Sequence, residues 1–217
     1  MQTARPTLLI SVLVTLPFTA YADGFIDPLP ADYPIPANSL VVDYEGTVFE
    51  VSDGVADYAD YAVGDGIAGR LIVDLSSGVD SRSGPNRRSY GSSIDPSGFV
   101  RGFWIPGGDG EDGVFIANDL LREGDDGPVD IFSVSDEYIV TNGSGDGAMV
   151  FSLNATLYDF LDNVDIDQSF EVTSADADQP HEDFSGSIRF SSIGPIPLVK
   201  FALDRLSIKP GRCFAPT

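Results

Sequence analysis

The sequence predicts an all-β fold, built as an antiparallel β-sandwich or jelly-roll-like single domain. Apolar and polar residues alternate over several segments, which is the pattern of strands with one buried face. Glycine and proline, 23 and 15 of the 217 residues, separate these segments, and both are turn residues. Several short strands divided by turns are typical of a sandwich or a jelly roll.

The alternation places most of the strands. It is clearest over residues 40–51, 67–75, 147–158 and 184–190. Weaker strands are expected at 98–104, 113–117, 129–134 and 137–141. A strand is also expected at 197–208, where the pattern slips in the way that a β-bulge produces. The only helix that the sequence predicts is a short one at 157–163.

Glycines on the apolar faces of these strands indicate close packing. Gly46, Gly69 and Gly186 each lie on the inward-looking face of a predicted strand, and glycine at such a position marks a bulge or a close approach of two backbones. Val63-Gly64-Asp65 predicts the turn before the second main strand, with Gly64 at positive φ.

The first 22 residues read as a cleavable signal peptide. Arg5 precedes an apolar run from Leu8 to Leu16, and Ala20-Tyr21-Ala22 resembles a cleavage site. The run is too short to span a bilayer, and no later segment is long enough to do so. We therefore expect a secreted protein, periplasmic or extracellular, with no membrane anchor in the mature chain. Residues 23–38 then form a proline-rich extended lead-in, 39–210 the β-sandwich domain and 211–217 a tail.

The charge of the chain restricts its partners. Its 34 acidic and 12 basic residues give a formal net charge of -22. Such a surface repels nucleic acid and anionic lipid, so we expect no nucleic-acid partner. Two explanations of the acidity stay open: cation binding, or adaptation of the surface to saline surroundings.

Calcium is the cation that the acidic loops suit best. Ca²⁺ takes several oxygen ligands from carboxylates and backbone carbonyls, and no EF-hand loop is present. Ordinary aspartate turns are the alternative explanation. The candidate calcium ligands are Asp162, Asp165, Asp167, Asp109 and Asp112.

Two further features suggest interactions with other molecules. Arg82, Arg87 and Arg88 form a basic cluster in the Ser/Gly-rich segment 76–97, which could hold an anionic glycan or the acidic body of a neighbouring copy; a solvated loop is the alternative. The single cysteine, Cys213, has no intramolecular partner, so it pairs with another molecule or stays a free thiol.

Catalytic signals are weak. His181 is the only histidine, and it lies in a polar turn before a strand, where a solvated side chain is expected. No Gly-x-Ser-x-Gly elbow is present. Glycoside hydrolysis needs only a pair of carboxylates, which an acidic chain supplies by chance. Aromatic residues that could stack on a sugar are Tyr58, Tyr61, Tyr90 and Trp104, of which Trp104 is expected in the core.

Short motifs along the domain support an exported β fold by resemblance. They are Tyr44-x-Gly46-x-Val48-x-x-Val51, Val63-Gly64-Asp65, Gly69, Asp74, Asn118-Asp119 and Phe184-x-Gly186-x-Ile188. The chain resembles a loose group of uncharacterised exported bacterial β proteins, many of which carry a PEP-CTERM sorting tail. The resemblance implies a secreted β fold and no particular activity. This chain lacks the Pro-Glu-Pro motif and the hydrophobic span of that tail.

The sequence therefore favours a secreted, non-enzymatic β-sandwich that binds a molecule outside the cytoplasm or belongs to a matrix or envelope, with Ca²⁺ as a stabilising ion. An extracellular glycan and a second copy of the chain are the expected partners. The alternative is an extracellular carbohydrate-active enzyme that uses a pair of Asp or Glu residues.

Overall fold

The computed structural model describes eleven segments of the chain, and every structural statement below refers to them. They are residues 27–28, 35–36, 39–74, 84–90, 100–101, 103–104, 113–121, 127–142, 145–164, 169–190 and 196–211. The predicted signal peptide and Cys213 lie outside these segments.

The described chain is almost entirely β-strand. The strands are β1 (Asp27–Pro28), β2 (Ser39–Val51), β3 (Gly66–Asp74), β4 (Arg87–Tyr90), β5 (Val100–Arg101), β6 (Phe103–Trp104), β7 (Gly113–Leu120), β8 (Val129–Asn142), β9 (Gly145–Leu157), β10 (Phe170–Thr173), β11 (Phe184–Phe190) and β12 (Leu198–Pro210). Short helical turns are η1 (Val55–Asp57), η3 (Ser174–Asp176) and α1 (Pro180–Asp183). None of these turns has the length or the apolar character needed to cross a bilayer.

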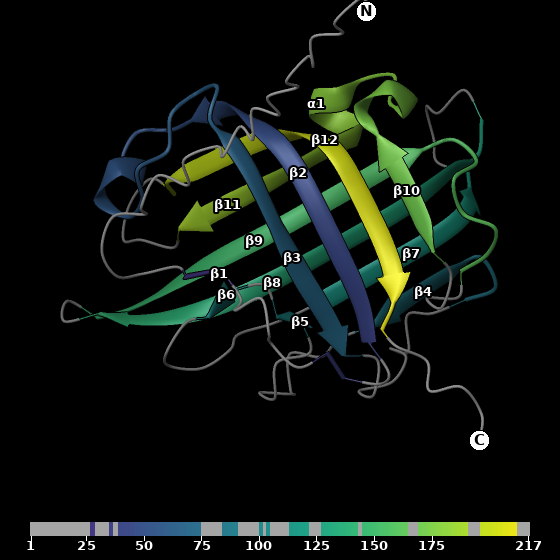
Figure 1. Cartoon of the computed structure of the whole chain (residues 1–217), viewed down its shortest axis with the longest axis horizontal. Helices are drawn as coiled ribbons and strands as arrows, with labels where there is room; N and C mark the ends of the chain where they lie inside the picture. Colours follow the sequence, from purple (N-terminus) through teal and green to yellow (C-terminus); the bar gives the residue numbers. More distant parts are fainter. Residues whose placement is uncertain are drawn as a thin grey trace, which may run out of the picture.

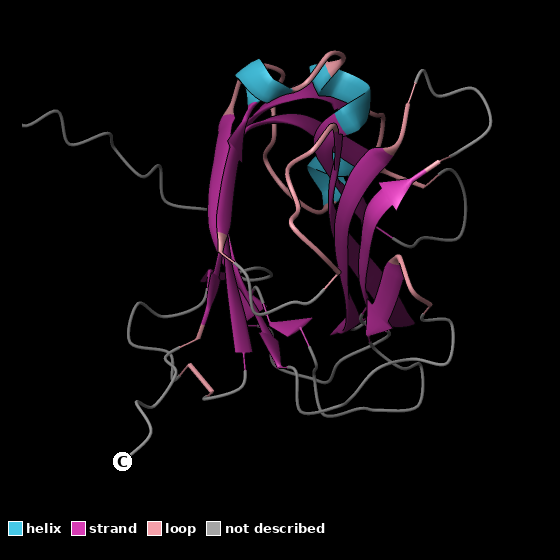
Figure 2. Ribbon diagram, turned by 90° about the vertical axis from the view of Figure 1, so that its right-hand side faces the viewer, coloured by secondary structure: helices cyan, strands magenta, loops and turns pink. Residues whose placement is uncertain are grey.

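Ten of the strands form one antiparallel sheet that folds over into two layers. Its order is β4-β7-β8-β9-β11-β12-β2-β3-β5, and β10 pairs with β12 beside this path. In Figure 1, β2, β3 and β10 lie in front of β7, β8 and β9, and Figure 2 shows the two layers from the side, joined by curved strands at one end. The predicted all-β sandwich is confirmed, and one continuous sheet makes both of its layers.

The bend lies in β12, which belongs to both layers. Its first half, from Leu198 to Ala202, pairs with β11. Its second half, from Arg205 to Ile208, pairs with β10. Both halves pair with β2, and the register shifts at Lys200/Phe201 and at Leu203/Arg205. The predicted slip in the pattern is therefore a real irregularity, and such irregularities let a long strand bend.

The core lies between the layers and follows the predicted alternation. Tyr44, Phe151 and Phe201 pack together at ring-centroid distances of 5.1, 6.2 and 5.9 Å. A methyl group on Gly186 would overlap the ring of Phe201, and one on Gly69 would overlap the Tyr44 hydroxyl. The glycines therefore make room for the aromatic rings. At the predicted turn, Gly64 has a φ of 97°, as expected.

One predicted strand division and one predicted helix are wrong. Residues 129–134 and 137–141 belong to one strand, β8, because β9 pairs with it from Asp130 to Asn142. The polar stretch between them looked like a break, yet Asp136 points inward on the strand and is fully buried. The predicted helix at 157–163 is absent from the described chain: β9 runs to Leu157, and bends follow.

Other weakly patterned segments contain short strands. Residues 98–104 hold β5 and β6, and β6 pairs with β1, so that Asp27 of the proline-rich lead-in lies opposite Trp104. The segment 76–97 was expected to be a loop, but Arg87–Tyr90 form β4, an edge strand on β7.

Candidate functional site

Of the predicted calcium ligands, the structure describes Asp162, which is exposed. Asp165, Asp167, Asp109 and Asp112 lie outside the described residues. Among the residues that are described, no three or more His, Cys, Asp or Glu side chains gather closely enough to hold a metal ion. Calcium binding therefore stays a prediction from the sequence.

Asp130 is a buried carboxylate that the sequence did not single out. It is 1% exposed. One of its oxygens accepts a hydrogen bond from the backbone N–H of Asp119 at 2.9 Å, and the other accepts from Phe160 and Leu161, both at 2.7 Å. Asp119 and Asp159 have positive φ values of 54° and 52°. The carboxylate thus clamps the bulge of β7 and the chain that leaves β9.

The basic cluster is partly tied to the backbone. Arg88 is half-buried on β4 and donates to the carbonyl of Gly84 at 3.3 Å, whereas Arg87 is exposed. Arg82 lies outside the described residues. The structure therefore places two of the three arginines on an edge strand.

His181 lies in α1 directly before β11 and is exposed, as the sequence predicted for a residue in a pre-strand turn. Its ring meets Phe49 edge to face at a centroid distance of 4.4 Å. This contact packs α1 against the outside of β2.

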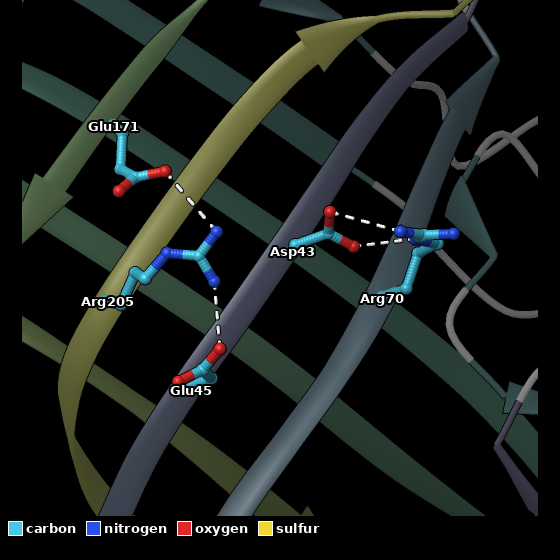
Figure 3. Close-up of polar contacts among 5 residues, drawn as sticks. All are labelled: Asp43, Glu45, Arg70, Glu171 and Arg205. Atoms are coloured by element: carbon cyan, nitrogen blue, oxygen red, sulfur yellow. Dashed lines mark hydrogen bonds and ion pairs between the residues drawn. The ribbon is translucent and has the colours of Figure 1, made fainter. Parts of the chain in front are cut away.

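A ladder of ion pairs crosses the outer face of β10, β12, β2 and β3 (Figure 3). Arg205 on β12 reaches Glu45 on one side at 2.8 Å and Glu171 on the other at 3.3 Å. Arg70 donates two hydrogen bonds to Asp43, from Nε at 2.6 Å and from Nη2 at 3.1 Å. We call these five residues the charge ladder.

Every group of the charge ladder has a partner of opposite charge. The hydrogen bonds that Arg70 donates to Asp43 raise the pKa of Arg70 above its ordinary value. Glu171 and Glu45 raise the pKa of Arg205. Beside the ladder, Lys200 binds Glu50 at 2.8 Å. Each of these carboxylates is bound by a cation on an exposed sheet face, which is an arrangement that supports the sheet.

The outer face of β8, β9 and β11 carries no charge at its centre. Two cross-strand rows run over it: Ser135 pairs with Ser152 and Ser152 with Ser187, while Ser133 pairs with Asn154 and Asn154 with Ser185. All six side chains are half-buried, and the Ser152 and Ser187 hydroxyls lie 2.9 Å apart. We call these six residues the polar face.

The polar face can offer many weak hydrogen bonds at once. Hydroxyl and amide groups both donate and accept, and cross-strand neighbours lie about 5 Å apart. In a chain with 34 acidic residues, an uncharged area of this kind suits an uncharged polymer that is rich in hydroxyl or amide groups.

The sequence indicated the outward side of the clearly alternating strands but did not reveal the polar face. Alternation assigned Ser152, Asn154, Ser185 and Ser187 to outward positions, whereas their adjacency depends on the pairing of β9 with β11. For Asp130, the available signal was a lone acidic residue within the apolar run from Val129 to Phe132.

Comparisons with known proteins returned nothing: no family model matches the chain, and neither a curated protein nor a solved structure is significantly similar to it.

Proposed function

We propose that this chain is an exported, non-enzymatic β-sandwich protein that works outside the cytoplasm by binding a polymer of the envelope or the extracellular matrix. The sequence supports export through its signal-peptide pattern and through its resemblance to exported bacterial β proteins. The structure supports the binding role through the polar face.

The polar face is the observation that carries the proposal. It joins three adjacent strands of a rigid sheet, so its six hydroxyl and amide groups keep a fixed spacing. A single hydrogen bond of this type contributes only about 1 kcal/mol net. An extended polymer that meets several of these groups together gains affinity without any deep pocket.

Three of the described carboxylates are held in contacts that leave them unsuited to acid–base catalysis. Glycoside hydrolysis needs one carboxylate that donates a proton and a second that acts as a nucleophile or base. Asp130 instead accepts three backbone hydrogen bonds, and Glu45 and Glu171 both bind Arg205. These carboxylates have structural roles.

Export is tested by expressing the full chain in a bacterial host and sequencing the N-terminus of the product. We expect a protein that begins at Asp23 and is found outside the cytoplasm. Unprocessed protein that remains in the cytoplasm would contradict this part of the proposal.

Binding is tested by co-sedimentation of the mature chain with isolated peptidoglycan sacculi and with insoluble extracellular polysaccharide. The double variant Ser152→Arg with Ser187→Arg obstructs the polar face. Leu121→Arg adds the same side chain at a position that is 72% exposed and outside that face. We expect the wild type and Leu121→Arg to sediment with the polymer, and the double variant to remain in the supernatant. Retention that is equal in all three, or release of soluble sugar from either polymer, would overturn the proposal.

A further inference from the structure

The loop between β2 and β3 presents an aromatic ring on an apolar support. The Tyr58 ring stacks on Phe190, with the ring centroids 5.0 Å apart and the planes inclined by 15°. Phe190 is 5% exposed, whereas Tyr58 is 36% exposed. Since one face of the Tyr58 ring lies against Phe190, only the opposite face and the ring edges are open to a ligand.

The backbone holds this ring in place. Val55 is 1% exposed and anchors η1 in the core. Its carbonyl accepts hydrogen bonds from the N–H groups of Tyr58 at 2.8 Å and Ala59 at 2.9 Å. Ser52 and Leu198 tie the start of the loop to β12, through backbone and side-chain hydrogen bonds of 2.9 and 2.7 Å. A ring that is held in this way loses little conformational freedom when a ligand covers it.

The loop that carries the ring is acidic. Asp53, Asp57 and Asp60 belong to the same loop, and all three are exposed. Carboxylates are strong acceptors for hydroxyl donors, and they repel anions. A ligand at this loop therefore needs a flat apolar surface for the ring, hydroxyl groups for the carboxylates and no negative charge.

We propose that Tyr58 is a stacking platform for a neutral pyranose ring, with Asp53, Asp57 and Asp60 as acceptors for the sugar hydroxyls. A pyranose with equatorial hydroxyls directs its C–H groups to the two faces of the ring, and these positive hydrogens meet the negative face of the tyrosine. The inference rests on the proposed function and names the ligand class, because it makes a polysaccharide the polymer that is bound.

The test is a titration of the mature full chain with cellohexaose, followed by NMR and by calorimetry. We expect saturable binding, an upfield shift of the sugar C–H protons under the tyrosine ring, and no effect of sorbitol, a polyol without a ring. Tyr58→Ala should weaken binding about tenfold. Tyr58→Phe keeps the stacking face and should bind within about twofold of the wild type.

Tyr158→Ala is the matched control, because Tyr158 is 50% exposed and lies on the chain that leaves β9. It should bind as the wild type does. No saturable binding of cellohexaose, or an equal loss in Tyr58→Ala and Tyr158→Ala, would overturn the inference. The upfield shift of the sugar C–H protons is measured in the wild type, so it does not depend on whether Tyr58→Ala folds. Binding of the sugar without this shift would also contradict stacking on Tyr58. If cellohexaose does not bind while the polar-face variants still alter co-sedimentation, the proposed Tyr58 sugar platform is wrong. The proposed binding of a polymer by the polar face is then still supported.

Discussion

At Gly186 the absence of a side chain is what lets the Phe201 ring sit in the core. A Cβ atom there would overlap that ring and approach the carbonyl oxygen of Ser152. We expect Gly186→Ala to lower the free energy of unfolding by about 1–3 kcal/mol, as overpacking does, in urea denaturation. Gly66→Ala is the control, because a methyl group at Gly66 meets nothing within 4 Å; it should change stability by less than about 1 kcal/mol. Equal effects at the two sites would contradict this account of the core.

The clamp at Asp130 is a second test at the scale of single residues. Asp130→Asn replaces a charged acceptor of three backbone N–H groups, and we expect a loss of about 1.5–3 kcal/mol in the free energy of unfolding. Asp159→Asn should cost less than about 0.5 kcal/mol, since Asp159 is exposed and asparagine also tolerates its positive φ. Hydrogen exchange at Phe160 and Leu161 should quicken in Asp130→Asn alone. Unchanged exchange at both amides would count against the clamp.

The alternation of single residues was enough to predict strands, but not every element. Phe151, Leu153 and Ala155 identified β9 because one polar residue separates each of them from the next. β8 appeared as two strands because Asp136 takes an inward position where an apolar residue was expected. The false helix at 157–163 arose because local pattern does not show the hydrogen bonds from Phe160 and Leu161 to the distant Asp130.

Among the elements, the charge ladder is expected to make only a modest contribution to the pairing of β2 with β3. Arg70 and Asp43 are partly exposed, so we expect a coupling energy of about 0.2–1 kcal/mol in a double-mutant cycle of Arg70→Gln and Asp43→Asn. The coupling should shrink further in about 1 M NaCl, where screening is strong. A coupling energy that is larger than this range, or that does not change with NaCl concentration, would show that the pair is desolvated.

At the scale of the whole molecule, the net charge of -22 should make stability depend on ionic strength. We expect the melting temperature of the mature chain to rise with NaCl as self-repulsion is screened. Calcium at matched ionic strength tests the predicted acidic ligands separately. An additional rise that chelator reverses would support those ligands by mass action. If calcium gives no additional rise in melting temperature, the acidity is explained as a general property of the surface and not by calcium binding.

The sequence predicted the fold better than it predicted the candidate binding sites on the surface. Alternation and turn residues act locally, so they indicate an antiparallel β-sandwich from one chain alone. The polar face depends on which strands become neighbours, and the Tyr58 platform depends on the contact with Phe190. Such contacts join residues far apart in the chain, and no local pattern specifies them.

The most direct test of the central claim, binding through an uncharged face, is the salt dependence of co-sedimentation with insoluble polysaccharide. Binding through hydroxyl and amide groups releases few ions, so the affinity of the wild type should change little as NaCl increases. The variant with Ser152→Arg and Ser187→Arg should stay in the supernatant at every NaCl concentration. Affinity that falls steeply with salt, or that survives in this variant, would contradict the claim.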